Sequence, residues 1–160
     1  MVRTEISLFL KNAPGELGRL TMMLSEAKIN IDAMTIQDAS EYVQKIFRSR
    51  GKTIKRIASA ASYSSIKKDS GDYALIRLLV DKIDEAIDLL SKNNYVFDII
   101  AVIAITIDNQ PGVLARIAQQ FGENGINISY VYGSALPGEN KSLFIFCPED
   151  IELAASIFKD

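Results

Sequence analysis

The stretch that decides the fold occurs twice, as Asn12-Ala-Pro-Gly-Glu-Leu-Gly-Arg19 and as Asn109-Gln-Pro-Gly-Val-Leu-Ala-Arg116. The shift of 97 residues between these stretches also aligns Ile29-Asn30-Ile31 with Ile126-Asn127-Ile128. Agreement at one fixed offset, with no gap between the two matches, indicates an internal repeat. The sequence therefore contains two copies of one supersecondary unit.

The residues before each turn alternate between apolar and other types. The apolar members are Ile6, Leu8 and Leu10 in the first copy and Ile103, Ile105 and Ile107 in the second. This period of two predicts a strand with one buried face, so Glu5, Ser7 and Phe9 are expected on the opposite face. In the turn that follows, proline fixes φ and glycine permits a close approach of the backbone.

A helix is predicted after each turn. Its apolar stripe consists of Leu17, Leu20, Met23, Leu24 and Ala27 in the first copy and of Leu114, Ile117, Ala118 and Phe121 in the second. Asn124-Gly125 is expected to end the second of these helices. A second strand is predicted over residues 30–37 of the first copy and 127–134 of the second.

The remaining elements complete the pattern. The first copy continues with a strand at 73–80, a helix that Asp81 caps and Asn93-Asn94 ends, and a strand at 95–100. The second copy continues with a strand at 142–147 and a helix from about 149 to 159. The resulting order, β-α-β-β-α-β, is the ferredoxin-like order. We therefore expect an α+β protein with two such repeats, 1–100 and 101–160. Each repeat is expected to form an antiparallel sheet with helices on one face, and the second repeat lacks its last strand.

Composition excludes several classes of protein. The chain has 160 residues, of which 48% are hydrophobic and 24% charged, so it can bury a core. A formal net charge of −2 argues against a nucleic-acid binder that uses its whole surface. A single cysteine excludes an internal disulfide framework, and no apolar run reaches the ~20 residues that span a bilayer. We expect a cytoplasmic protein.

The residue types also argue against an enzyme. The chain has no histidine, the commonest general base and metal ligand. Cys147 lies in an apolar run that predicts a buried strand, where a thiol is normally inert. No carboxylates have a metal-binding or phosphate-binding spacing. We therefore expect no catalytic residue, no metal and no cofactor.

The repeated Asn-x-Pro-Gly-x-Leu, followed after one helix by Ile-Asn-Ile, resembles the ACT domain, a family of small regulatory modules that bind amino acids. The resemblance covers roughly residues 4–38 and 73–160, and the whole chain is similar to tandem-ACT proteins. It implies an amino-acid effector and a partner enzyme of amino-acid metabolism. It also implies that asparagines at two motif positions contact the ligand, here Asn109 and Asn127, with Asn12 and Asn30 in the first copy.

The chemistry of the turn fits such a ligand. A helix that starts at a Pro-Gly turn offers backbone N–H groups and a positive dipole end to a carboxylate, and asparagine can both donate and accept. The candidate ligand-binding residues are Asn12, Pro14, Gly15, Glu16, Leu17, Asn30 and Ile31 in the first copy and Asn109, Gln110, Pro111, Gly112, Val113, Leu114, Asn127 and Ile128 in the second. Serine-sensing ACT domains often have a histidine two residues before the turn asparagine, where this chain has Leu10 and Ile107. A more apolar effector is therefore as compatible as serine.

The same residues also allow a purely structural interpretation. Asn-x-Pro-Gly makes a good turn and helix start without any ligand, and Asn30 and Asn127 can simply cap the start of a strand. Duplicated domains often keep one working site and one degenerate interface. The sequence leaves open whether both copies bind.

Residues 41–71 have no counterpart in the second copy. They contain eight basic and two acidic residues, which leaves the rest of the chain with a net charge of −8. Their apolar spacing predicts two short amphipathic helices, separated at Gly51. We favour a solvated basic cap over a nucleic-acid contact, and keep a ligand-responsive nucleic-acid-binding regulator as the alternative function.

A homodimer is expected from the missing last strand. Without that strand, Ala101 to Ile107 would present an apolar open edge, which invites strand pairing. Either the strand that starts at Tyr95 or another subunit would cover it.

Overall fold

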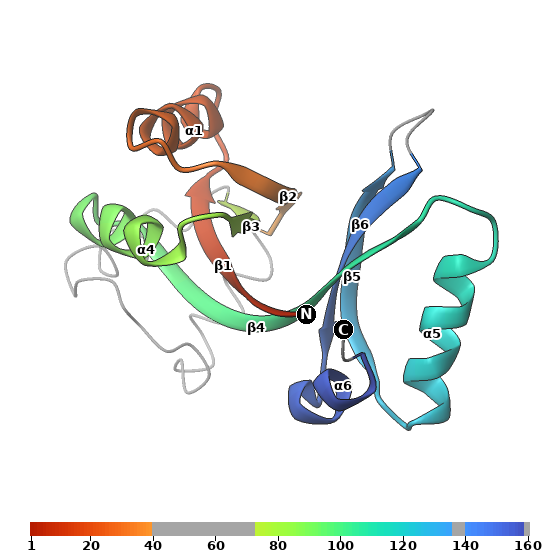
Figure 1. Cartoon of the computed structure of the whole chain (residues 1–160). Coiled ribbons are helices and arrows are strands. Elements are labelled where there is room, and N and C mark those ends of the chain that lie inside the picture. The colour runs from red at the N-terminus through yellow and green to blue at the C-terminus, as the bar shows by residue number, and fades with distance from the viewer. Residues whose placement is uncertain (40–72, 136–139, 159–160) are drawn as a thin grey trace. The chain divides into compact units, whose positions relative to one another are not determined.

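A computed structural model describes residues 1–39, 73–135 and 140–158 (Figure 1). The predicted basic insertion at 41–71 lies outside the described residues. The elements are β1 (Val2–Lys11), α1 (Glu16–Glu26), β2 (Ile31–Asp38), β3 (Tyr73–Val80), α4 (Ile83–Lys92), β4 (Val96–Asp108), α5 (Val113–Glu123), β5 (Ile128–Ala135), β6 (Lys141–Pro148) and α6 (Ile151–Ile157). The α+β prediction is confirmed, and the order β-α-β-β-α-β is present.

The strands are hydrogen-bonded in the order β2-β3-β1-β4-β6-β5. β3 is antiparallel to both β1 and β2, and β6 is antiparallel to both β4 and β5. In register, Lys11 faces Tyr73 in the first repeat, and the equivalent Asp108 faces Lys141 in the second. The two repeats therefore pair their strands in the same way.

The chain forms two compact units, Glu5–Ile100 and Met1–Thr4 with Ala101–Asp160, which we call the first and the second unit. The core of the first unit joins alternate residues of β1 and β3 to the inner faces of α1 and α4, with Leu8, Leu24 and Leu90 almost fully buried. The core of the second unit contains Phe121 and Phe146, whose ring centroids are 5.2 Å apart. In each unit the helices thus cover one face of the strands, as the hydrophobic periods predict.

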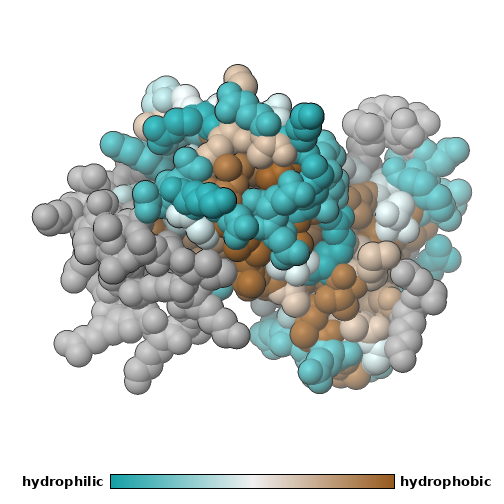
Figure 2. Space-filling model, turned by 60° about the vertical axis from the view of Figure 1, so that its left-hand side comes forward, coloured by the Kyte–Doolittle hydropathy of each residue, from teal (hydrophilic) through white to brown (hydrophobic). Residues whose placement is uncertain are grey.

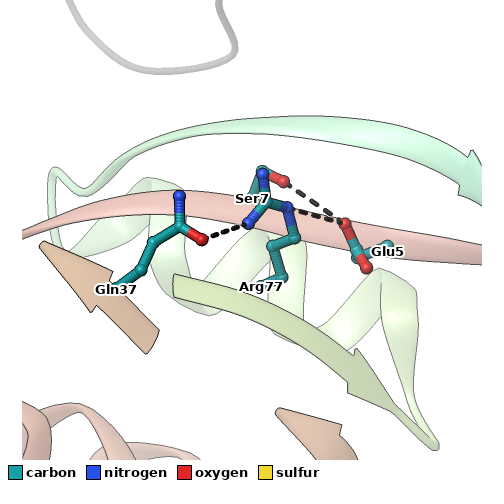
Figure 3. A network of polar contacts seen from close by, with 4 residues as sticks. All are labelled: Glu5, Ser7, Gln37 and Arg77. Atoms are coloured by element: carbon teal, nitrogen blue, oxygen red, sulfur yellow. Dashed lines mark hydrogen bonds and ion pairs between the residues drawn. The ribbon is translucent and has the colours of Figure 1, made fainter. Parts of the chain in front are cut away.

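β1 is buried on both faces, although its alternation predicts one. Glu5 is 0% exposed and Ser7 7% exposed. Figure 3 shows Arg77 of β3 between Glu5 of β1 and Gln37 of β2. Arg77 Nε lies 3.9 Å from Glu5 Oε1, Arg77 Nη1 donates to Gln37 Oε1 at 3.4 Å, and the Ser7 hydroxyl donates to Glu5 Oε1 at 3.4 Å. Polar partners on this face satisfy side chains that a period-two pattern assigns to solvent.

β4 is one continuous strand of 13 residues, whereas the sequence predicts two strands in succession. The strand that starts near Tyr95 is therefore the same strand as Ala101 to Ile107 and cannot cover its edge. Instead, Ala104 N–H donates to Met1 O at 2.9 Å, and the Met1 ammonium donates to Ala104 O at 3.2 Å. Met1, the residue before β1, thus pairs with the edge that the sequence predicts to be open, and β1 is the neighbour of β4 in the strand order.

The aspartates that precede α4 and α6 have different roles. Asp81 does not cap α4, because the N-cap residue of this helix is Lys82. The carboxylate of Asp81 instead accepts the backbone N–H of Asn30 at 2.8 Å. Asp150 does cap α6, by accepting Leu153 N–H at 2.9 Å. The sequence signal is the same for both aspartates, and the contact of Asp81 with the start of β2 decides its role.

Cys147 is buried, as its strand context predicts. None of the helices within the described ranges is long and apolar enough to cross a membrane.

Candidate functional site

The two Asn-x-Pro-Gly turns have the same backbone geometry. Gly15 has φ 89° and ψ −16°, and Gly112 has φ 90° and ψ −14°. In both turns the residue after the asparagine donates its N–H to the residue before it, from Ala13 to Lys11 at 2.9 Å and from Gln110 to Asp108 at 2.8 Å. These φ values lie in the left-handed region, so glycine is the residue that the turn requires.

The first turns of α1 and α5 carry no side-chain cap within the part of the chain that the structure describes. The N-cap residue in each is the left-handed glycine, which has no side chain to accept an N–H. The turn residues Asn12, Pro14, Asn109 and Pro111 are all exposed. Each helix therefore presents backbone N–H groups and the positive end of its dipole at an accessible surface. This arrangement can bind a carboxylate.

The asparagines after the helices lie away from the turns. Asn12 precedes α1 and Asn30 follows it, and the 11 residues of this helix at ~1.5 Å per residue put roughly 16 Å between its ends. Asn109 and Asn127 lie at opposite ends of α5 in the same way. The structure therefore does not bring the two asparagines of one repeat together, and a single amino acid cannot contact both of them within that repeat.

Asn30 and Asn127 have partners within the protein. The side chain of Asn30 donates to Asp32 at 3.2 Å, and that of Asn127 donates to Glu149 Oε1 at 2.9 Å. Their backbone carbonyls accept from the N–H groups of Asp81 and Glu149, at 3.1 and 3.0 Å. These contacts join the start of β2 or β5 to the end of the neighbouring strand. Ile31 and Ile128, which follow the asparagines, are half-buried and pack against the cores.

A pocket of about 570 Å³ lies beside the turn of the first unit, and we call it the α1 pocket. Its lining consists of Phe9, Leu10, Lys11, Glu16, Arg19, Met22, Met23, Glu26, Tyr73, Asn93, Asn94, Tyr95 and Val96. Figure 2 shows one face of the molecule, on which apolar residues (brown and tan) are visible between hydrophilic ones (teal). The α1 pocket combines an apolar interior with charged residues of both signs.

The second unit has a hollow at the equivalent place on α5, which we call the α5 groove. It is lined by Val113, Arg116, Ile117, Gln119, Gln120 and Glu123. Five of these residues are the counterparts, 97 positions later, of the α1 residues that line the α1 pocket. The α5 groove lies along this one helix, whereas residues 93–96 and Tyr73 also line the α1 pocket. The two hollows correspond in position and differ in chemistry.

The charges beside the two turns are also arranged differently. In the first unit Arg19 Nη2 donates to Glu16 Oε2 at 2.7 Å, along the first turns of α1. In the second unit Lys141 Nζ donates to Asp108 Oδ1 at 2.6 Å, across the strand pair. This hydrogen bond and the charge of Lys141 lower the pKa of Asp108 below its ordinary value, and Arg116 adds to the effect.

A family model described as an ACT domain pair matches residues 51–158, more than half of the chain. The chain belongs to the ACT domain pair family. ACT domains are regulatory modules that typically bind amino acids and regulate partner enzymes. No curated protein matches the sequence.

Solved structures share the ACT fold of this chain at low sequence identity. Protein BT0572 from Bacteroides thetaiotaomicron has a TM-score of 0.72 and 24% identity, with 99% of this chain and 88% of that chain covered. The ligand-free regulatory subunit of aspartate kinase from Thermus thermophilus has a TM-score of 0.56 and 15% identity, with 99% and 91% covered. The regulatory subunit of aspartate kinase from Thermus flavus has a TM-score of 0.52 and 15% identity, with 98% and 92% covered.

Most of the α1 pocket lies outside the repeated motif. Met22, Tyr73 and Tyr95 come from three separate parts of the chain, and only the strand pairing and helix packing bring them near Lys11 and Glu16. One sequence signal points to the pocket, because residues 16, 19, 23 and 26 recur at helical spacing directly after the motif. Over the described ranges, no group of three or more potential metal ligands occurs.

Proposed function

We propose that this ACT domain pair is a non-enzymatic regulatory module that binds a free amino acid at an Asn-x-Pro-Gly turn and the helix N-terminus that follows. Binding would control a partner enzyme of amino-acid metabolism or another regulator. The observation that carries the proposal is the pair of accessible turns with left-handed glycines and helix starts without side-chain caps. A fold that keeps this geometry twice supports a role for the geometry beyond turning the chain.

The proposed contacts follow from the chemistry of a zwitterion. Backbone N–H groups at the start of α1 or α5 donate to the ligand carboxylate, where the helix dipole favours negative charge. The amide of Asn12 or Asn109 at the rim of the turn donates and accepts. A ligand held there can meet Asn30 or Asn127 only if these residues come from a different repeat or another chain.

Assembly is part of the proposal. β2 and β5 are the outer strands of the hydrogen-bonded order, and β2 exposes Met34 and Ile36 at 38% and 45%. Exposed strand edges with apolar side chains favour pairing with a second copy. We therefore propose a homodimer, located in the cytoplasm. A clean 17.7 kDa monomer in light scattering at high concentration would contradict it.

A thermal-shift screen of the full chain against the twenty amino acids tests the proposed function. A ligand that binds only the folded state stabilises it by ~2.7 kcal/mol at 100 times its dissociation constant. The expected result is a rise in melting temperature with one amino acid or a chemically related group. Asn12→Ala and Asn109→Ala form a matched pair, and at least one should weaken the response. If none of the twenty changes the melting temperature at millimolar concentration, the proposal fails.

The alternative, a ligand-responsive nucleic-acid-binding regulator, rests on the charge of residues 41–71. Eight basic residues against two acidic ones in a chain of net charge −2 are an uneven distribution. Binding to a DNA or RNA duplex whose affinity falls steeply with salt would favour it.

A further inference from the structure

The α1 pocket has the features of a side-chain pocket for the ligand. We infer that it selects a free amino acid with a large apolar side chain, of the methionine, leucine or phenylalanine type, and that the α5 groove of the second unit does not. The inference rests on the proposed function and adds the chemical class of the ligand and the repeat that binds it.

The interior of the α1 pocket is apolar and formed by well-packed residues. Leu10 and Tyr73 are 3% and 7% exposed, and Met23 and Tyr95 pack against the core of the first unit. Met22 is 62% exposed and provides an apolar side chain at the mouth. A volume of about 570 Å³ falls in the ~300–1,000 Å³ range of small-molecule pockets. Such a lining favours an apolar body, because burying it removes apolar surface from water.

Charges of both signs surround this interior. Lys11 and Arg19 contribute cations, and Glu16 and Glu26 contribute carboxylates. Glu16 already accepts from Arg19 through Oε2, and a carboxylate has further acceptor positions for an ammonium group. Lys11 adjoins the turn, where the ligand carboxylate would lie. A zwitterion with an apolar side chain complements this set, whereas a purely apolar compound or a simple anion complements only part of it.

The α5 groove keeps one cation and one carboxylate, Arg116 and Glu123, but differs from the α1 pocket at three of the five corresponding positions. Gln119 and Gln120 stand where α1 has Met22 and Met23, and Val113 stands in place of Glu16. The counterpart of Lys11 is Asp108, which is acidic and hydrogen-bonded to Lys141. At this position the second unit thus has an ion pair of Asp108 with Lys141, where the first unit has the ammonium group of Lys11. The second unit therefore keeps the turn, whereas the described lining of its groove differs from that of the α1 pocket in the two methionines and in Glu16.

Isothermal titration calorimetry of the full chain tests the inference, with L-methionine, L-leucine, L-phenylalanine, L-serine and glycine as ligands. We expect at least one of the three large apolar amino acids to bind at least tenfold more tightly than serine or glycine. N-acetyl-L-methionine, which lacks the ammonium group, should bind at least tenfold more weakly than methionine.

The variants copy the second repeat into the first. Met22→Gln with Met23→Gln should weaken binding of the preferred ligand at least tenfold. Met22→Gln alone changes an exposed residue, so it should fold normally and still weaken binding several-fold. The matched control is Gln119→Ala with Gln120→Ala in the α5 groove, which should leave the affinity unchanged. Circular dichroism reports whether each variant is folded.

The outcomes separate the inference from the proposed function. If serine or glycine binds as tightly as the large apolar amino acids, or if folded Met22→Gln binds like the parent protein, the inference is wrong and the proposed function stands. Loss of affinity in the Gln119→Ala, Gln120→Ala control would likewise overturn the assignment to the first repeat. If no amino acid binds, both fail.

Discussion

The two repeats share a backbone and differ in the surface beside it. The turn glycines agree within 2° in φ and ψ, yet five positions along the following helix read Glu, Arg, Met, Met, Glu in the first repeat and Val, Arg, Gln, Gln, Glu in the second. Left-handed backbone is a requirement of the fold, because only glycine adopts it without strain. Ligand chemistry depends on side chains that the fold leaves free to vary. The motif therefore identifies the family, and we propose that the helix after the motif decides which repeat binds the ligand.

The largest expected effect tests a difference between the repeats at one position of the outer strands β2 and β5. Gly133 faces Phe144 in the second repeat, where the first pairs Ile36 with Ile76. A Cβ at Gly133 would lie 2.6 Å from both the Leu143 carbonyl oxygen and the Phe144 ring. Gly133→Ala should therefore cost ~1–3 kcal/mol of unfolding free energy, which urea denaturation measures.

Ile36→Ala is the matched control for this prediction. Ile36 is 45% exposed, so its truncation leaves only a small void and should cost less than Gly133→Ala. Equal costs would show that the second repeat accommodates the extra atom and that the two strand pairs differ less than the structure indicates.

Substitution of either turn glycine by alanine should lower the unfolding free energy by the same amount. At Gly15 and Gly112 the position that a Cβ would occupy has no heavy atom within 4 Å, so the cost of alanine arises from the backbone conformation alone. Gly15→Ala and Gly112→Ala should each lower the unfolding free energy by about 1–2 kcal/mol. Chemical denaturation of both variants checks this. A difference of more than ~1 kcal/mol would contradict the equivalence of the turns.

How far the sequence predicts the structure depends on how local each feature is. The sequence predicts the strand at 73–80 with the correct bounds and finds both turns, because a short apolar run and a Pro-Gly pair are local signals. It does not predict the pairing of Met1 with Ala104 or the contact of Asp81 with Asn30, since each joins residues far apart in the sequence. The sequence does not predict the α1 pocket either, because residues far apart in the sequence line it.

The strand-start asparagines should show a smaller effect. Asn127→Asp would place a second carboxylate beside Glu149, where the native amide donates at 2.9 Å. Both side chains are exposed, so we expect a loss on the order of 0.5 kcal/mol at neutral pH that added salt reduces. Asn30→Asp, beside Asp32, is the control in the first repeat. Denaturation curves at low and high salt measure both, and salt-independent losses would contradict the like-charge explanation.

The smallest effect concerns the pair that distinguishes the second turn. Because Lys141 lowers the pKa of Asp108 in the folded protein, the pair contributes stability above the ordinary aspartate pKa. That contribution is lost as the pH falls through the lowered folded value. The melting temperatures of the parent protein and Asp108→Asn should therefore differ slightly at neutral pH and converge in acid. Lys141→Gln should show the same pH dependence as Asp108→Asn. A difference in melting temperature that grows as the pH falls would contradict the predicted direction.

The most direct test of the central claim counts the ligands bound by each chain. Equilibrium dialysis of the full chain against the labelled amino acid that binds best in calorimetry gives this number at saturation. We predict about one amino acid per chain, because we propose that the α1 pocket, and not the α5 groove, accommodates the side chain of the ligand. Two per chain would show that the turn is sufficient and that the α1 pocket does not decide which repeat binds. No saturable binding would contradict the assignment of the ligand to the turn itself.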